Sequence, residues 1–197
     1  MHDSRKNLRS RLMNERRMLT SDAQRAAATT VCEIVHELLA DRVPGTVAAY
    51  LSHGGELDPE PTIERLVGLG WRVVLPVCGD DASMVFCPWA PGDHLEPNRY
   101  GIGEPISAPV DESTIDVVLV PGVGFDRTGA RIGHGVGYYD RFFARLAAAE
   151  QHPLRLALAH DLQLVALPEP EEWDVPMHII ATPSEVITVD FRPTEQR

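Results

Sequence analysis

The chain has 197 residues, of which 44% are hydrophobic and 24% charged, and its formal net charge is −11 at pH 7. This composition is ordinary for a soluble globular domain, and the negative charge argues against general binding to nucleic acid. No apolar run approaches the roughly 20 residues needed to cross a bilayer, and the polar N-terminus lacks the apolar core of a secretory signal. We therefore expect a cytoplasmic protein with one domain over residues 1–197.

Predicted helices and strands alternate along the chain. Apolar periodicity predicts helices over residues 5–19, 22–40, 59–69 and about 138–150, with Thr20 or Ser21 capping the second. Strand-like runs cover residues 46–51, 71–77, 84–87, 115–120, 154–159, 179–181 and 186–189. The Pro- and Gly-rich segment 88–110 is interpreted as one long loop. This alternation predicts an α/β fold with βαβ units and a mostly parallel sheet.

The most informative stretch runs from Val120 to Phe142 and reads VPGVGFDRTGARIGHGVGYYDRF. It joins a buried-strand pattern to a helix pattern through a glycine-rich loop, which lets a ligand approach the backbone closely. When such a loop opens a helix, its N–H groups and the helix dipole favour an anion, most often a phosphate. Since open α/β sheets bind ligands beyond the carboxyl ends of their strands, we expect the site here.

Charged and aromatic side chains follow this loop at once. Asp140 lies in the first turn of the helix, where a phosphate would repel it unless a divalent cation stood between them. We expect Asp140 to be solvated, so that Asp140→Ala would abolish turnover with little loss of stability. Tyr139 fits the apolar stripe of the helix, which leaves Tyr138 for the site side. Arg5 and Arg9 form a basic face on the first helix.

At these residues the sequence resembles the 5-formyltetrahydrofolate cyclo-ligase family, also called methenyltetrahydrofolate synthetases. The resemblance rests on the Pro-Gly, Phe-Asp and Gly-x-Gly-x-Gly-Tyr-Tyr-Asp-Arg pattern, and it extends to the basic N-terminal helix, residues 50–56 and 101–105, and the Asp174 segment. It implies an ATP- and Mg²⁺-dependent conversion of 5-formyltetrahydrofolate to 5,10-methenyltetrahydrofolate, ADP and phosphate, through a phosphorylated formyl group. The implied fold is a three-layer α/β sandwich similar to that of ribose-5-phosphate isomerase and CoA transferases.

The resemblance also implies the roles of individual residues. ATP would be bound by Arg5, Lys6, Arg9, Arg131, Gly133, His134, Gly135, Val136, Gly137, Tyr138 and Tyr139. The folate substrate would contact Leu51, Glu56, His134, Gly135, Val136, Gly137 and Tyr138. Asp140 and Asp174 would hold Mg²⁺, and Arg141 and Tyr138 are the candidate catalytic residues. The expected partner is this small substrate, possibly polyglutamylated, with no nucleic acid or membrane, and we expect a monomer.

Three positions depart from the family pattern, at Arg5, Val136 and His178. Many relatives carry lysine at Arg5, and His178 replaces a frequent second acidic residue after Asp174. Val136 replaces a glycine or lysine; because β-branched residues resist positive φ, either this position has an ordinary φ or the loop is strained. Two alternatives stay open. One is a non-catalytic relative that binds folate or nucleotide, and the other is an isomerase- or CoA-transferase-like enzyme that is active without ATP.

Overall fold

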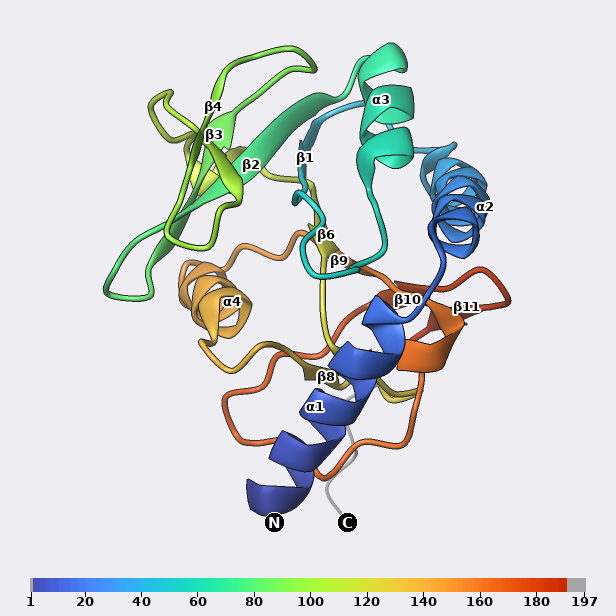
Figure 1. The fold of residues 1–197 in the computed structure, drawn as a ribbon. Coiled ribbons are helices and arrows are strands. Elements are labelled where there is room, and N and C mark those ends of the chain that lie inside the picture. Colours follow the sequence, from blue (N-terminus) through green and yellow to red (C-terminus); the bar gives the residue numbers. More distant parts are fainter. Residues whose placement is uncertain (1, 191–197) are drawn as a thin grey trace.

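The central element of the protein is a seven-stranded sheet with strand order β11-β10-β9-β6-β1-β2-β3 (Figure 1). The computed structural model describes residues 2–190. The strands are β1 Thr46–Ala48, β2 Arg72–Cys78, β3 Met84–Pro88, β6 Val117–Val120, β9 Leu154–Leu158, β10 Ile179–Ala181 and β11 Val186–Thr188. The inner strands β10, β9, β6, β1 and β2 are parallel, and only the edge strands β11 and β3 pair antiparallel. The expected α/β fold with a mostly parallel sheet is confirmed.

Helices cover both faces of this sheet. Along β6, Val117 and Leu119 pack toward α2 (Ser21–Leu39) and α3 (Glu60–Gly68), whereas Val118 and Val120 pack toward α4 (Tyr138–Ala148). All four side chains of β6 are buried, because alternate residues of a strand point to opposite faces. Figure 1 shows α2 and α3 together on one side of the sheet and α4 on the other. These three layers confirm the expected sandwich.

The first helix, α1 (His2–Arg17), lies outside these layers. Its Leu12 is fully buried against Val123 and Ile132, which belong to the segment that follows β6. This contact places the helix over the carboxyl end of the sheet. The second helix begins at the predicted cap, since the Thr20 hydroxyl accepts a hydrogen bond from the Ala23 N–H at 3.2 Å.

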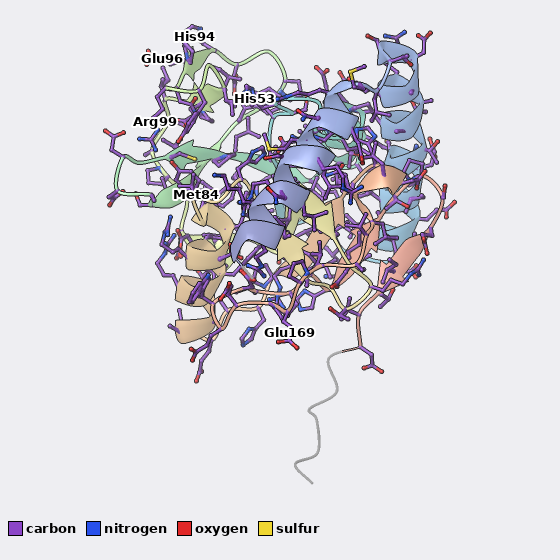
Figure 2. The ribbon with its side chains drawn as sticks, turned by 60° about the horizontal axis from the view of Figure 1, so that its bottom comes forward. His53, Met84, His94, Glu96, Arg99 and Glu169 are labelled. Atoms are coloured by element: carbon purple, nitrogen blue, oxygen red, sulfur yellow. The ribbon has the colours of Figure 1, made fainter. Side chains whose placement is uncertain are left out.

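Two segments interpreted as irregular loops contain β-hairpins instead. Segment 88–110 carries β4 (Leu95–Pro97) and β5 (Gly103–Pro105), and the glycine-rich stretch carries β7 (Gly124–Phe125) and β8 (Arg131–Ile132). In the first hairpin, the Asn98 carboxamide oxygen accepts from the N–H groups of Tyr100 and Ile102 (Figure 2 labels Glu96 and Arg99 here). These side-chain contacts add to the backbone hydrogen bonds between Asn98 and residues 101 and 102. Proline in both strands of the hairpin hid the strand pattern in the sequence.

Other boundaries shift by a few residues, and the first strand ends at Ala48 rather than at residue 51. Two short 3-10 helices, η1 (Glu112–Thr114) and η2 (Asp161–Gln163), complete the elements between residues 2 and 190. No helix of this described part is long and apolar enough to cross a membrane. That residues 1–197 form one domain stays a prediction, and residues 191–197 lie outside the described part.

Candidate functional site

The loop of residues 133–137 leads from β8 into α4 at the carboxyl end of the sheet. Gly135 and Gly137 have φ values of +103° and +79°, and Gly137 caps α4. Within residues 2–190, Ala82 and Glu150 are the only non-glycine residues with positive φ, so Val136 has an ordinary φ. The loop therefore accommodates valine without backbone strain at that position. Of the two alternatives, an ordinary φ at Val136 or a strained loop, the first is correct.

Each glycine of this loop faces a guanidinium group. A Cβ atom built on Gly133 would lie 2.8 Å from Nη1 of Arg131, one on Gly135 would lie 3.8 Å from Cζ of Arg9, and one on Gly137 would lie 3.2 Å from Nη1 of Arg141. The three arginines come from β8, α1 and α4. An anion resting on the loop backbone would thus meet positive charge from three separate elements.

Arg9 joins α1 to the loop directly. Its Nε donates to the Gly133 carbonyl at 2.8 Å. Burial, and then repulsion from Arg5, lower the pKa of the Arg9 guanidinium. A bound anion would reduce the repulsion between these neighbouring cations, and it would be attracted by each of them.

The two carboxylates expected to hold a metal each engage an arginine. Asp140 accepts from Arg131 Nη2 at 2.8 and 2.9 Å, and Asp174 accepts from Arg5 Nη2 at 2.6 Å. The Asp140 side chain is only 18% exposed, so the expectation that it is solvated is wrong. Its charge at the start of α4 is compensated by Arg131, a partner that the sequence argument did not consider.

The carboxylates of Asp140 and Asp174 come from adjoining segments. The Val175 N–H points at Asp140 Oδ1 from 3.5 Å, a long contact that places residues 174–175 beside the start of α4. No group of three or more His, Cys, Asp or Glu residues in the described part gathers as a metal cluster. Mg²⁺ does not require one, since it commonly binds one or two carboxylates together with phosphate oxygens and water. These two residues therefore suit such an ion.

Glu56 and His134 meet although 78 positions separate them. The distance from His134 Nε2 to Glu56 Oε1 is 3.1 Å, and the Glu56 side chain is 9% exposed. Arg16 lies beside them, with Nη1 3.9 Å from the same Glu56 oxygen. The glycine loop and the segment around Glu56 are thus joined by a side-chain contact.

The two tyrosines at the start of α4 have different surroundings. Tyr138 accepts a hydrogen bond from Arg99 Nη2 at 2.8 Å, across to the β4–β5 hairpin. The Tyr139 ring lies under the Arg131 guanidinium at 5.5 Å and beside Phe143 at 6.1 Å, so this side chain joins the core layer. Burial raises the pKa of both phenols, which keeps them neutral near pH 7.

Three expected or discussed residues lie apart from this cluster. Lys6 is exposed, and no polar contact joins its ammonium group to the loop within residues 2–190. Leu51 packs against the core and faces the hairpin, 3.6 Å from a Cβ built on Gly103. His178 accepts from the Arg155 N–H at 2.9 Å, near the amino end of β9 and away from Asp174.

Sequence reasoning missed Arg16 and Arg99. Arg16 follows Leu12 by four residues and so continues the apolar stripe of α1. A cation at a position of this stripe could have indicated a buried charge from the sequence alone. Arg99 sits in the segment interpreted as a loop, where no pattern pointed to its contact with Tyr138.

Known proteins match this chain over most of its length. The model of the 5-formyltetrahydrofolate cyclo-ligase family matches residues 1–183. A 5-formyltetrahydrofolate cyclo-ligase of Escherichia coli (strain K12) is 40% identical over 146 residues, which are 72% of this chain and 79% of the relative. One of Mycolicibacterium smegmatis is 33% identical over 193 residues, 93% of this chain and 96% of the relative.

Solved structures agree with the fold. The Aquifex aeolicus 5,10-methenyltetrahydrofolate synthetase superposes with a TM-score of 0.81 at 26% identity, covering 98% of this chain and 96% of that one. A 5,10-methenyltetrahydrofolate synthetase from Mycoplasma pneumoniae gives a TM-score of 0.76 at 21% identity over 91% and 98% of the two chains, a likeness of fold. The family match over residues 1–183 shows that this chain belongs to the 5-formyltetrahydrofolate cyclo-ligase family.

Proposed function

We propose that the protein converts 5-formyltetrahydrofolate to 5,10-methenyltetrahydrofolate with hydrolysis of ATP to ADP and phosphate. The observation that carries this proposal is the glycine loop of residues 133–137, lined by the guanidinium groups of Arg9, Arg131 and Arg141. In a member of this family, such a loop is suited to the polyphosphate of the co-substrate. A cytoplasmic location, a monomeric state and use of polyglutamylated folate stay predictions from the sequence.

The chemistry explains why the reaction needs ATP. A formamide is a poor electrophile, and hydroxide is a worse leaving group than phosphate. Transfer of the γ-phosphoryl group to the formyl oxygen releases ADP and gives an iminium-like carbon. The N10 lone pair then attacks this carbon, which closes the ring, and N10 loses its proton. Cleavage of the carbon–oxygen bond releases phosphate and leaves the 5,10-methenyl group.

The protein contributes positioning and charge neutralisation to these steps. We propose that Arg5, Lys6 and Arg9 from α1 bind ATP together with the loop and β8, through Arg131, Gly133, His134, Gly135, Val136, Gly137, Tyr138 and Tyr139. Lys6 differs from the others because it is exposed and makes no hydrogen bond to the loop within residues 2–190.

Asp140 and Asp174 are proposed to hold Mg²⁺, which would neutralise phosphate charge when bound. Each is paired with an arginine that we also assign to ATP, Asp140 with Arg131 and Asp174 with Arg5. Nucleotide with its metal would offer both members of each pair a new partner of opposite charge. The existing pairs therefore keep both charges compensated before the co-substrate arrives.

The folate is proposed to bind between the loop and the segment of residues 51–56, through Leu51, Glu56 and residues 134–138. Tyr138 and Arg141 are the proposed catalytic residues. The Tyr138 phenol is protonated near neutral pH, and burial raises its pKa further, so it can donate to a developing oxyanion. Arg141 donates to the Ala82 carbonyl at 3.1 Å and to the Val136 carbonyl, which fixes its cation beside the loop.

The test is an absorbance assay for the methenyl product near neutral pH, with and without ATP and Mg²⁺. We expect product only with both, and one phosphate released per product formed. Binding of folate and ATP without ring closure would instead identify a non-catalytic relative. Product formed without ATP would contradict the proposed phosphorylation.

A further inference from the structure

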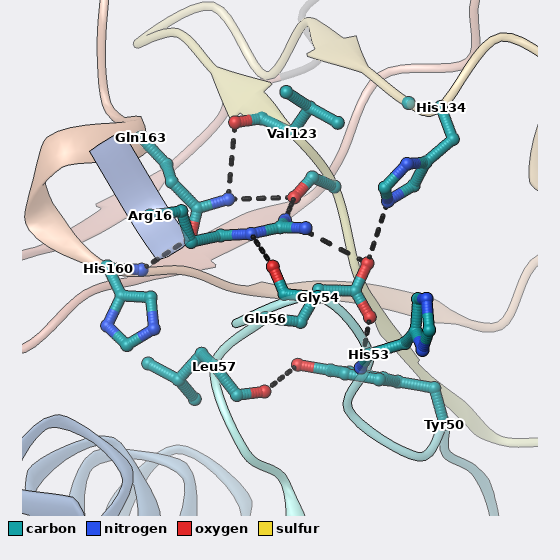
Figure 3. A network of polar contacts seen from close by, with 12 residues as sticks. Arg16, Tyr50, His53, Gly54, Glu56, Leu57, Val123, His134, His160 and Gln163 are labelled. Atoms are coloured by element: carbon teal, nitrogen blue, oxygen red, sulfur yellow. Dashed lines mark hydrogen bonds and ion pairs between the residues drawn. The ribbon is translucent and has the colours of Figure 1, made fainter. Parts of the chain in front are cut away.

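Arg16 is a buried cation at the C-terminal end of α1. Its side chain is 1% exposed. Nε donates to the Gly54 carbonyl at 3.2 Å, and Nη1 donates to the Gly122 carbonyl at 3.0 Å (Figure 3). The guanidinium thereby ties the turn before Glu56 to the segment that leaves β6. Few arginines are buried to this extent, because removing the charge from water costs several kcal/mol.

Glu56 is the charged neighbour of this arginine. The 3.9 Å between Arg16 Nη1 and Glu56 Oε1 is an ion-pair distance, too long for a hydrogen bond. The direct partners of the carboxylate are the His53 N–H, 3.2 Å from Oε2, and His134 Nε2, 3.1 Å from Oε1. Arg16 therefore compensates the charge of Glu56 while backbone carbonyls hold the guanidinium in place.

A second layer of contacts stabilises this arrangement. Gln163 Nε2 donates to the Gly122 carbonyl at 2.7 Å, and its Oε1 accepts from the His160 N–H at 3.0 Å. Figure 3 shows Arg16 and His134 contacting Glu56, while Gln163 of η2 contacts the Gly122 carbonyl that Arg16 also binds. Two distant parts of the chain, α1 and the glycine loop, thus contact the carboxylate directly, and η2 supports the carbonyl that holds Arg16.

The network is not built for stability alone. Nη2 of Arg16 is buried and has no hydrogen-bond partner within residues 2–190, which costs stability. Burial lowers the pKa of Arg16, and Glu56 acts against that shift. An apolar side chain of similar length at this position of the stripe would avoid both costs, so the cation points to a role at the site.

We propose that Arg16 is a positioning residue that holds the carboxylate of Glu56 in place and aimed at the folate. The inference rests on the proposed function, in which Glu56 contacts that substrate. An ionised carboxylate accepts hydrogen bonds from N–H groups, which the reduced folate carries. His134 shares Oε1 of Glu56, so Arg16 also acts on the loop proposed to contact both substrates.

The test compares Arg16→Met with the wild type by steady-state kinetics and by calorimetric binding of 5-formyltetrahydrofolate without ATP. We expect the KM and Kd for the folate to rise about 10- to 100-fold, because a buried carboxylate loses its compensating cation. The KM for ATP should change less than about threefold, and Arg16→Lys should recover most of the folate affinity. Equal folate affinity in Arg16→Met and the wild type would overturn the proposal.

Leu12→Ala is the matched control, since Leu12 lies one turn before Arg16 on the same buried face. It should lower Tm while leaving the folate KM unchanged; a rise equal to that in Arg16→Met would show that helix docking alone matters, and the proposal fails. If Arg16→Met does not fold, a cycle of Arg16→Gln, Glu56→Gln and the double variant decides. Coupled folate Kd values support the inference, and additive values overturn it. Wild-type protein that binds folate but forms no product contradicts the proposed function alone.

Discussion

The two ends of the parallel strands differ in chemistry. At the amino ends of β6, β9 and β10 lies a cavity of about 560 Å³, lined among others by Arg42, Asp116, His152 and His178. At the carboxyl ends, the glycine loop presents backbone and guanidinium groups that come from α1, β8 and α4. The presence of a cavity alone would favour the amino ends as the site.

This difference shows that the convergence of charged and polar groups locates the site better than the presence of a cavity does. In the carboxyl-end region, polar side chains meet from residues as far apart as Arg5 and Asp174, or Glu56 and His134. Ligand sites in open α/β sheets lie at this end for a topological reason, since the loops that leave parallel strands gather there. Substitutions at the carboxyl end should therefore change substrate kinetics, and those at the amino end only stability.

The largest effect is expected at Asp140. Asp140→Ala should lower kcat about 10²- to 10³-fold, because it removes a proposed metal ligand. It should also lower the free energy of unfolding by about 1–3 kcal/mol, because it leaves the buried Arg131 without its carboxylate partner. Steady-state assays and denaturant unfolding measure the two effects.

Asp140→Asn separates these effects. The amide oxygen can still accept from Arg131, so we expect stability within about 1 kcal/mol of the wild type while turnover stays low. Wild-type turnover in either variant would show that Asp140 is not a metal ligand. It would also contradict the expectation that substitutions at the carboxyl end change substrate kinetics.

The second effect concerns the loop backbone. Gly135→Ala places a methyl group 3.8 Å from the Arg9 guanidinium carbon at a φ of +103°. We expect the KM for ATP to rise about tenfold, since the methyl group occupies space beside the proposed phosphate position, and stability to fall by about 1–2 kcal/mol.

Gly92→Ala is the control for backbone strain. Gly92 has a φ of +98°, and a Cβ built there meets nothing within 4 Å. We expect Gly92→Ala to lose as much stability as Gly135→Ala while its KM for ATP is unchanged. A matching rise in the KM for ATP would mean that global strain, rather than the loop, governs nucleotide binding.

Sequence and structure agree where periodicity determines the outcome. The buried run around β6 and the helix after Gly137 could be predicted, because alternation and apolar stripes report burial directly. The partners of charged residues could not. Nothing in the spacing of Arg131 and Asp140 shows that β8 brings them to 2.8 Å, and the β7–β8 hairpin that does so is only two residues per strand. Contacts such as Arg16 with Gly122 depend on tertiary packing alone.

A smaller effect distinguishes Arg5 from Lys6 within the basic face of α1. Arg5 is bonded to Asp174 and also donates to the Glu169 carbonyl at 3.2 Å (Glu169 is labelled in Figure 2), whereas Lys6 is exposed. Arg5→Gln should raise the KM for ATP about three- to tenfold, and Lys6→Gln less than twofold. Equal effects would show that general positive charge on the helix, rather than placed guanidinium groups, attracts the nucleotide.

The smallest effect is expected at the amino end, at His178. Burial, followed by repulsion from Arg155, His152 and Arg42, lowers the pKa of His178 from 6.5 to about 4. The unfolded chain therefore takes up this proton first, so the stability gained above the unfolded pKa is lost as the pH falls from 6.5 toward 4. Thermal unfolding should show that His178→Asn, which keeps an acceptor for the Arg155 N–H, reduces the acid loss of Tm, whereas His152→Asn, at an exposed position, changes it less. A change in the KM of either substrate at neutral pH in His178→Asn would contradict the separation of the two ends, since it would place a contribution to substrate binding at the far edge of the sheet.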